Sequence, residues 1–135
     1  MKRPLWVLLL LGVFAGCGGS ANSDLPFSLS GSWDLSTRSS TSATNVWSIA
    51  TVNQTGDLVT GIVAISSPDP PCPWGEVLTG RISGKAINFE LDQSGQQVSF
   101  TGSIASGGAS MSGTYTTTST GCDSGDSGTW SATKT

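Results

Sequence analysis

The sequence contains no histidine, one tyrosine and few charged residues, which make up 11% of its 135 residues. Histidine is the side chain most often used as a general base or a metal ligand near neutral pH, so its absence removes the commonest routes to both. No serine stands in the Gly-x-Ser-x-Gly turn that carries an activated nucleophile in one large class of hydrolases. We therefore expect the protein to be no enzyme and to hold no metal or other cofactor.

Positive charge is also scarce, because six Lys and Arg residues stand against nine Asp and Glu residues, for a formal net charge of −3. The basic residues that follow position 16 are scattered along the chain. The chain thus lacks the basic patch on which nucleic-acid binding depends, and we expect no nucleic-acid partner.

The one long apolar run lies between Leu5 and Phe14, after Lys2 and Arg3 and before small residues that lead to Cys17. This is the layout of a secretion signal, and the run is too short to span a membrane as a helix. The letters FAGC at its end resemble the lipobox of bacterial lipoproteins, although Phe14 stands where leucine is usual. The resemblance implies a signal peptide over residues 1–16 and a lipidated Cys17; the alternative is an ordinary signal peptide with a chance cysteine.

A lipidated Cys17 implies that acyl chains anchor the protein to the cell membrane or the outer membrane, on the extracytoplasmic side. Several acyl chains hold a protein stably on a membrane, whereas one chain does so only marginally. Residues 17–30 begin with Gly, Ser and Asn, and we expect them to form a flexible tether. Removal of residues 1–16 also removes two basic residues, which brings the net charge near −5.

Two further cysteines, Cys72 and Cys122, remain after the lipid attachment site. Disulfides persist in exported proteins, and two cysteines allow a single pairing, so we expect a Cys72–Cys122 disulfide. A metal site is the alternative, but the chain offers neither histidine nor a nearby third thiolate for it. Trp74, in the stretch PCPWG, is interpreted either as a cover for this disulfide or as an exposed contact for a partner.

Residues 31–135 are predicted to form a single all-β domain. They are rich in Thr, Ser, Gly, Val and Ile, turn residues recur about every ten positions, and no window shows a helical period. This pattern is typical of an antiparallel sheet. We expect eight strands, at about 31–36, 45–53, 58–66, 76–82, 86–92, 97–105, 110–118 and 128–134.

The stretch AINFELD alternates apolar and polar residues, with Ile87, Phe89 and Leu91 on one face. The same alternation elsewhere predicts an inner face that contains Trp33, Leu35, Trp47, Ile49, Val98, Phe100, Met111, Tyr115 and Trp130. Four glycines fall in the middle of predicted strands and on this face: Gly61, Gly80, Gly102 and Gly113. Inward glycines permit the sharp coiling of a sheet that closes on itself, so we expect an up-and-down barrel of about eight strands rather than a two-sheet sandwich.

Strand parity sorts the connections into two ends of this barrel. Tight turns at 54–57, 83–85 and 106–109 share one end, and longer loops at 37–44, 67–74, 93–96 and 119–128 share the other. Both cysteines of the expected disulfide lie in loops of the second end. We expect this rim to meet any partner, through Arg38, Asp69, Trp74, Asp123 and Asp126. The aspartates could instead gather for Ca²⁺, but their spacing fits no EF-hand loop.

At GSWDL, LVTGIV, VLTGRI and MSGTY the chain resembles the avidin and streptavidin family and, more loosely, the lipocalins. The resemblance implies an eight-stranded up-and-down barrel over about residues 31–135. Ser39 matches the family's first-loop serine that meets biotin, but Leu35, Val63, Leu91 and Phe100 replace other biotin contacts. Since those changes leave buried polar groups of biotin unpaired, we expect no biotin binding.

Two functional interpretations follow. The first is an envelope interaction or structural protein whose barrel is packed solid and whose loop rim meets another macromolecule. The alternative is a binding module for a small apolar ligand lined by Trp33, Trp47, Phe100, Tyr115 and Trp130. The predicted inner face carries no ionisable residue apart from the Tyr115 phenol, which leaves no buried carboxylate pair for catalysis.

Overall fold

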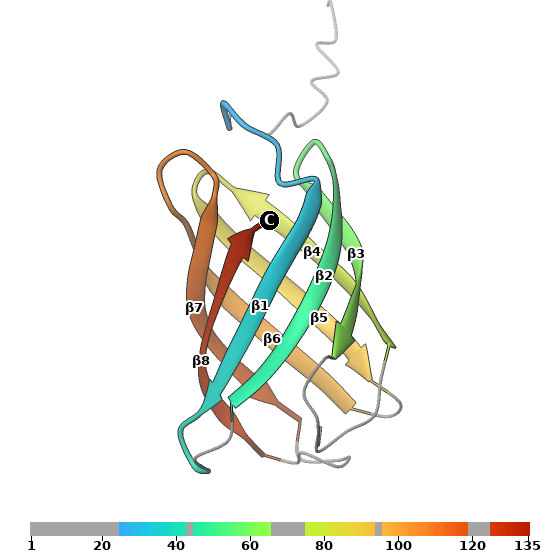
Figure 1. Cartoon of the computed structure of the whole chain (residues 1–135), viewed down its shortest axis with the longest axis vertical. Coiled ribbons are helices and arrows are strands. Elements are labelled where there is room, and N and C mark those ends of the chain that lie inside the picture. The colour runs from blue at the N-terminus through green and yellow to red at the C-terminus, as the bar shows by residue number, and fades with distance from the viewer. Residues whose placement is uncertain (1–24, 43–44, 66–74, 94–95, 119–124) are drawn as a thin grey trace, which may run out of the picture.

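The computed structural model describes residues 25–42, 45–65, 75–93, 96–118 and 125–135. Eight antiparallel strands form a closed barrel in which each strand pairs with its neighbours in sequence and the last pairs with the first (Figure 1). The predicted all-β barrel is therefore confirmed. The strands are β1 Gly31–Ser39, β2 Asn45–Thr55, β3 Leu58–Ile65, β4 Gly75–Ser83, β5 Ala86–Gln93, β6 Gln96–Ile104, β7 Ser110–Thr117 and β8 Ser127–Lys134.

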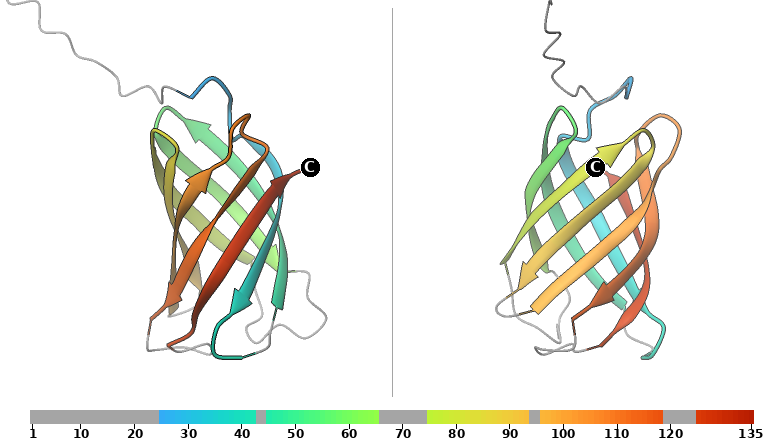
Figure 2. Two further views of the ribbon diagram at one scale, coloured as in Figure 1. Left: turned by 90° about the vertical axis from the view of Figure 1, so that its left-hand side faces the viewer. Right: turned by 180° about the vertical axis from the view of Figure 1, so that it is seen from behind.

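The two ends of the barrel differ as the strand parity predicted. The turns between β2 and β3, between β4 and β5, and between β6 and β7 lie together at one end, where the chain also enters β1 and leaves β8 (Figures 1 and 2). The strand ends that border the connections from β1 to β2, β3 to β4, β5 to β6 and β7 to β8 lie at the opposite end. We call these the tight-turn end and the loop end. The described residues contain no helix long and apolar enough to cross a membrane.

Two-residue turns set the register of the β2–β3 and β4–β5 hairpins at the tight-turn end. Gly56 has a φ of 62° and is followed by Asp57, between the paired residues Thr55 and Leu58. A glycine with positive φ at the first central position is the pattern of a type II′ hairpin, whose twist suits the flanking strands. A turn of fixed length makes the inward face of one strand determine the inward face of the next.

This constraint corrects the predicted inner face of β2. The buried residues of the strand are Ser48, Ala50 and Val52, whereas Trp47 and Ile49 occupy the alternate positions. The expected inward parity of these two residues is therefore wrong, and their side chains lie outside the described part of the structure. The physical reason is the hairpin register, which pairs Val52 with Gly61 and so places both on the same face.

The inward glycines of the central strands allow neighbouring backbones to approach closely. Gly102 of β6 lies opposite Gly113 of β7, and Gly113 lies opposite the buried Trp130 of β8. A Cβ atom on Gly113 would collide with the backbone oxygen of Thr101, and one on Gly102 would lie 2.7 Å from the Trp130 ring. These glycines thus permit the coiling of the sheet and leave space for the indole, as a closed barrel requires.

Candidate functional site

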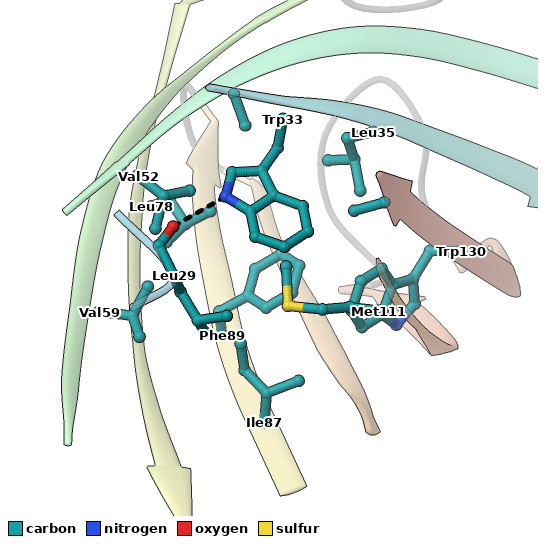
Figure 3. A pocket seen from close by; sticks show the side chains of 12 residues that line it. Leu29, Trp33, Leu35, Val52, Val59, Leu78, Ile87, Phe89, Met111 and Trp130 are labelled. Carbon is teal, nitrogen blue, oxygen red and sulfur yellow. Dashed lines mark hydrogen bonds between the residues drawn. The ribbon is translucent and has the colours of Figure 1, made fainter. Parts of the chain in front are cut away.

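The tight-turn end is closed by residues that precede the first strand. Leu29 is fully buried; its backbone N–H donates a hydrogen bond to Gln54 Oε1 at 2.7 Å, and Trp33 Nε1 donates one to the Leu29 carbonyl oxygen at 2.8 Å (Figure 3). Residues 25–30 were expected to belong to the tether, and this expectation is wrong. Leu25 and Phe27 of this segment also pack against the core. Because burial removes apolar surface from water, it favours the packed position of the segment over a solvated one.

We call residues 25–30 the plug. Lys134 and the turn between β6 and β7 hold the plug in place. Lys134 Nζ donates a hydrogen bond to the Ser28 carbonyl oxygen at 2.9 Å and lies 5.8 Å from the centroid of the Trp33 ring. The Phe27 ring occupies the space that a side chain at Gly108 would need. The plug therefore joins β1, β8 and the turn between β6 and β7 into one closed end.

The barrel interior below the plug is filled by aromatic and aliphatic side chains. Phe89 and Phe100 stack with ring centroids 4.5 Å apart, and the Trp130 ring meets both edge-on, at 5.1 and 5.9 Å. Phe100 also stacks on Tyr115 at 5.8 Å. Of the residues expected to line the interior, Trp33, Phe100, Tyr115 and Trp130 are buried, between 1% and 6% exposed.

A cavity of about 20 Å³ remains in this part of the interior. Its walls are apolar side chains that include Leu29, Trp33, Phe89, Met111 and Trp130 (Figure 3). A single water molecule needs roughly 10–15 Å³ by the same measure, so the space holds about one water and no organic ligand. The inward glycines do not create a ligand chamber here, since the neighbouring backbones and the tryptophans occupy the space.

The loop end is organised around one carboxylate, that of Asp126. Its Oδ1 atom accepts hydrogen bonds from Ser39 Oγ at 2.6 Å and Thr41 Oγ1 at 2.9 Å, and its Oδ2 atom accepts one from the Tyr115 hydroxyl at 2.8 Å. The Asp126 backbone N–H donates to Thr117 Oγ1 at 2.7 Å. Asp126 thereby ties the end of β1 and the β1–β2 connection to the entry into β8. We call Asp126, Ser39, Thr41 and Tyr115 the Asp126 cluster.

The electrostatics of the cluster keep the carboxylate ionised. Burial tends to raise the pKa of Asp126, but the hydrogen bonds from Ser39, Tyr115 and Thr41 stabilise the charged form and outweigh burial. The pKa of Asp126 therefore lies below the ordinary aspartate value. The loop end thus carries a fixed negative charge at neutral pH.

The structure places two of the expected rim residues at the loop end. Asp126 lies in its cluster, and Arg38 is exposed on β1, opposite Asn45 and Thr129. The other rim residues and all three cysteines lie outside the described residues: Cys17, Asp69, Cys72, Trp74, Cys122 and Asp123. Their roles, including lipidation and the Cys72–Cys122 disulfide, remain predictions. The strand ends that lead into the two cysteine loops do lie together at the loop end, from opposite sides of the barrel.

One buried polar position at the loop end was not expected from the sequence. Ser48 of β2 is 8% exposed. It shares the inner face with Ala50 and Val52, which the hairpin register with β3 determines.

No three Asp, Glu, Cys or His residues among the described positions come together as a metal site would require. A comparison with models of known protein families and with curated proteins finds no match to this chain.

Proposed function

We propose that the chain is a lipid-anchored, extracytoplasmic protein of the cell envelope whose packed barrel presents the loop end to a cationic or neutral polar partner. The observation that carries this proposal is the difference between the two ends. One end is sealed by Leu29, which follows Cys17 in the chain, and at the other end an ionised Asp126 holds the hydroxyl groups of Ser39 and Tyr115.

The position of the plug supports the orientation relative to the membrane. Eight peptide units separate Cys17 from Leu25, and a chain of that length spans at most roughly 30 Å. Acyl chains on Cys17 would therefore hold the tight-turn end close to the bilayer. The loop end would then point away from the membrane, where a macromolecular partner can reach it.

The distribution of charge along the barrel supports the same orientation. Arg81, Lys85 and Lys134 lie toward the tight-turn end together with the acidic Asp34 and Asp57. Toward the loop end, Asp92 is the second-last residue of β5 and Asp126 precedes β8, and Arg38 is the described basic residue there. A basic end suits the negatively charged surface of a bilayer, and an acidic end suits a cationic partner.

The alternative, a chamber for a small apolar ligand, finds no support in the described interior. The cavity of about 20 Å³ is smaller than any organic ligand, and Leu29 closes the barrel above it. A packed barrel is instead a rigid support for loops, and recognition on such folds is usually carried by loops.

Two measurements on the full chain in intact cells test this proposal. Radiolabelled palmitate should enter the wild type and not the Cys17→Ala variant, and the absence of label in the wild type would contradict the anchor. A photo-crosslinking residue at Ser42, in the β1–β2 connection, should capture a partner. The same residue at Lys85, at the tight-turn end, should capture lipid or nothing. Partner capture from Lys85 alone would reverse the orientation.

A further inference from the structure

The large exposed apolar side chains of the described barrel lie on one side of it. Leu58 and Ile62 on β3 and Val77 on β4 are 40%, 62% and 60% exposed, and they are the large exposed hydrophobic residues of the described chain. Ile62 pairs directly with Val77 in the sheet, and Leu58 pairs with Arg81. The outward residues of β3 and β4 thus form one continuous surface, which we call the β3–β4 face.

On the opposite wall of the barrel, the outward strand positions are occupied by polar residues. The outward positions of β6, β7 and β8 from the tight-turn end to the middle of the wall are all serine or threonine: Ser99, Thr101, Ser103, Ser110, Ser112, Thr114, Thr116, Thr129, Ser131 and Thr133. Threonine fits a strand as well as isoleucine or valine does. Apolar residues gathered on one wall therefore indicate a surface that is covered.

The β3–β4 face is neutral in its centre and carries one opposite-charge pair at its margin. Between Leu58 and Val77 the outward residues are Thr60, Ile62 and Thr79. At the tight-turn end of the face, Arg81 forms a 3.1 Å ion pair with Asp57, and these side chains are 70% and 36% exposed. A strongly acidic or basic partner would form no ion pairs with the neutral centre. A second β3–β4 face would pack its apolar centre on this one and bring a cation and an anion to the margin.

We propose that the β3–β4 face binds a second copy of this chain, across a two-fold axis that runs parallel to the strands between β3 and β4. Such an axis exchanges the two strands, so that Ile62 packs on the partner's Val77 and the partner's Ile62 packs on Val77. An isologous contact of this kind uses the same patch twice and closes as a dimer. The direct pairing of Ile62 with Val77 in the sheet makes the face self-complementary.

Charge complementarity extends the match to the margin of the face. The two-fold axis keeps both tight-turn ends on the same side, so Arg81 faces the turn that carries the partner's Asp57. Each copy contributes one cation and one anion, and the pair within each chain can be shared between the copies. The same axis lays the partner's β2 over a shallow depression of about 520 Å³ that Leu58, Thr79 and Arg81 border on the outer wall.

The size of the face sets the strength of the dimer. Two strands about 4.8 Å apart and about eight residues long present on the order of 250 Å². Stable complexes bury about 800 Å² per partner, so the contact is weak in dilute solution. Both chains enter β1 from the same end of such a dimer, so anchoring in one membrane would raise their effective concentration. The contact does not depend on the anchor, but its occupancy in cells rests on the proposed function.

The test is photo-crosslinking of the full chain in intact cells, with a benzophenone side chain in place of the exposed Thr79. We expect a covalent dimer of the chain from this position and none from a matched probe at Thr129, on the opposite wall. The Ile62→Thr, Val77→Thr double variant should lower the dimer yield about tenfold or more, because four buried apolar side chains, two from each copy, are lost from the contact. Its melting temperature should stay unchanged, since both side chains are exposed in the single chain.

Exchanging the charges of Arg81 and Asp57 distinguishes this two-fold contact from nonspecific association. Arg81→Glu should lower the dimer yield, because each copy then brings two acids to the margin, and adding Asp57→Lys should restore it. Four results would overturn the proposal: no dimer from Thr79, equal yield from Thr129, an unchanged yield in the double variant, or capture of lipid or another protein instead of a second copy. Failure of the exchange to restore the yield would overturn the two-fold arrangement. Palmitate labelling and the Ser42 probe report on the proposed function independently of all these results.

Discussion

The two ends of the barrel are held by different kinds of interaction. At the tight-turn end Leu29 is buried among apolar side chains, and the Trp33 indole donates to its carbonyl oxygen within that packing. At the loop end one half-buried carboxylate, Asp126, holds three hydroxyl groups from two other parts of the chain. Apolar burial does not depend on pH, whereas the Asp126 cluster depends on an ionised group. The two ends therefore differ in how their contribution to stability depends on pH.

The largest effect should come from the loop end, through the expected disulfide. Replacing Cys72 and Cys122 by serine should lower the free energy of unfolding by about 4 kcal/mol, because the bond closes a loop of about fifty residues in the unfolded chain. Chemical denaturation of the oxidised, reduced and double-variant proteins measures this difference. Alkylation of unreduced, denatured wild type that labels both thiols would show that the disulfide is not formed.

The plug at the tight-turn end should make the next largest contribution to stability. Leu29→Ala removes a fully buried side chain and should destabilise the protein by about 3 kcal/mol. Leu25→Ala, at a partly buried position of the same segment, is the control and should cost clearly less. Equal and small effects of both substitutions, measured by thermal or urea unfolding, would mean that residues 25–30 do not close the barrel.

The Asp126 cluster should contribute less, and its contribution should depend on pH. Asp126→Asn should cost about 1 kcal/mol at pH 7, because the charged acceptor of three hydrogen bonds is lost. The pKa of Asp126 is lowered in the folded protein, so its stabilisation is complete above the ordinary aspartate pKa and is lost as the pH falls through the lower folded value. The difference between wild type and Asp126→Asn should therefore shrink in acid. A difference that stays constant as the pH falls well below the ordinary aspartate pKa would contradict this account of the cluster.

The smallest effect should come from the ion pair between Arg81 and Asp57. Both side chains are exposed enough to be screened by solvent, and such pairs contribute below about 0.5 kcal/mol. Arg81→Ala should hence leave the unfolding midpoint of the single chain almost unchanged while lowering the crosslinked dimer yield. A large loss of stability would give Arg81 a role in the fold instead of at the surface.

The fold could be predicted from the sequence because its main features depend on short stretches of neighbouring residues. The alternation of Ile87, Phe89 and Leu91 indicated the inner face of β5, and the mid-strand glycines on that face indicated closure. The position of tight turns and loops at opposite ends followed from parity alone. These features depend on neighbouring residues, which a single sequence displays.

The errors have a common physical cause, since each depends on contacts between distant segments. In β2 the large residues Trp47 and Ile49 suggested the wrong face, and the correct one follows only through the hairpin pairing of Val52 with Gly61. Leu29 looked like part of a polar tether because its burial is provided by strands far along the chain. Ser39 and Thr41 were expected in a loop at the same rim as Asp126, but not their hydrogen bonds to it, because these residues lie 87 and 85 positions away from Asp126 in the chain.

The orientation of the barrel between membrane and partner is tested most directly by footprinting the full chain in intact envelopes and comparing it with purified protein. The account predicts that protection in envelopes reaches the loop end, at residues 38–42 and 125–127 next to the cysteine loops. Protection concentrated on the tight turns at 54–57, 83–85 and 106–109, with the loop end as reactive as in purified protein, would contradict it.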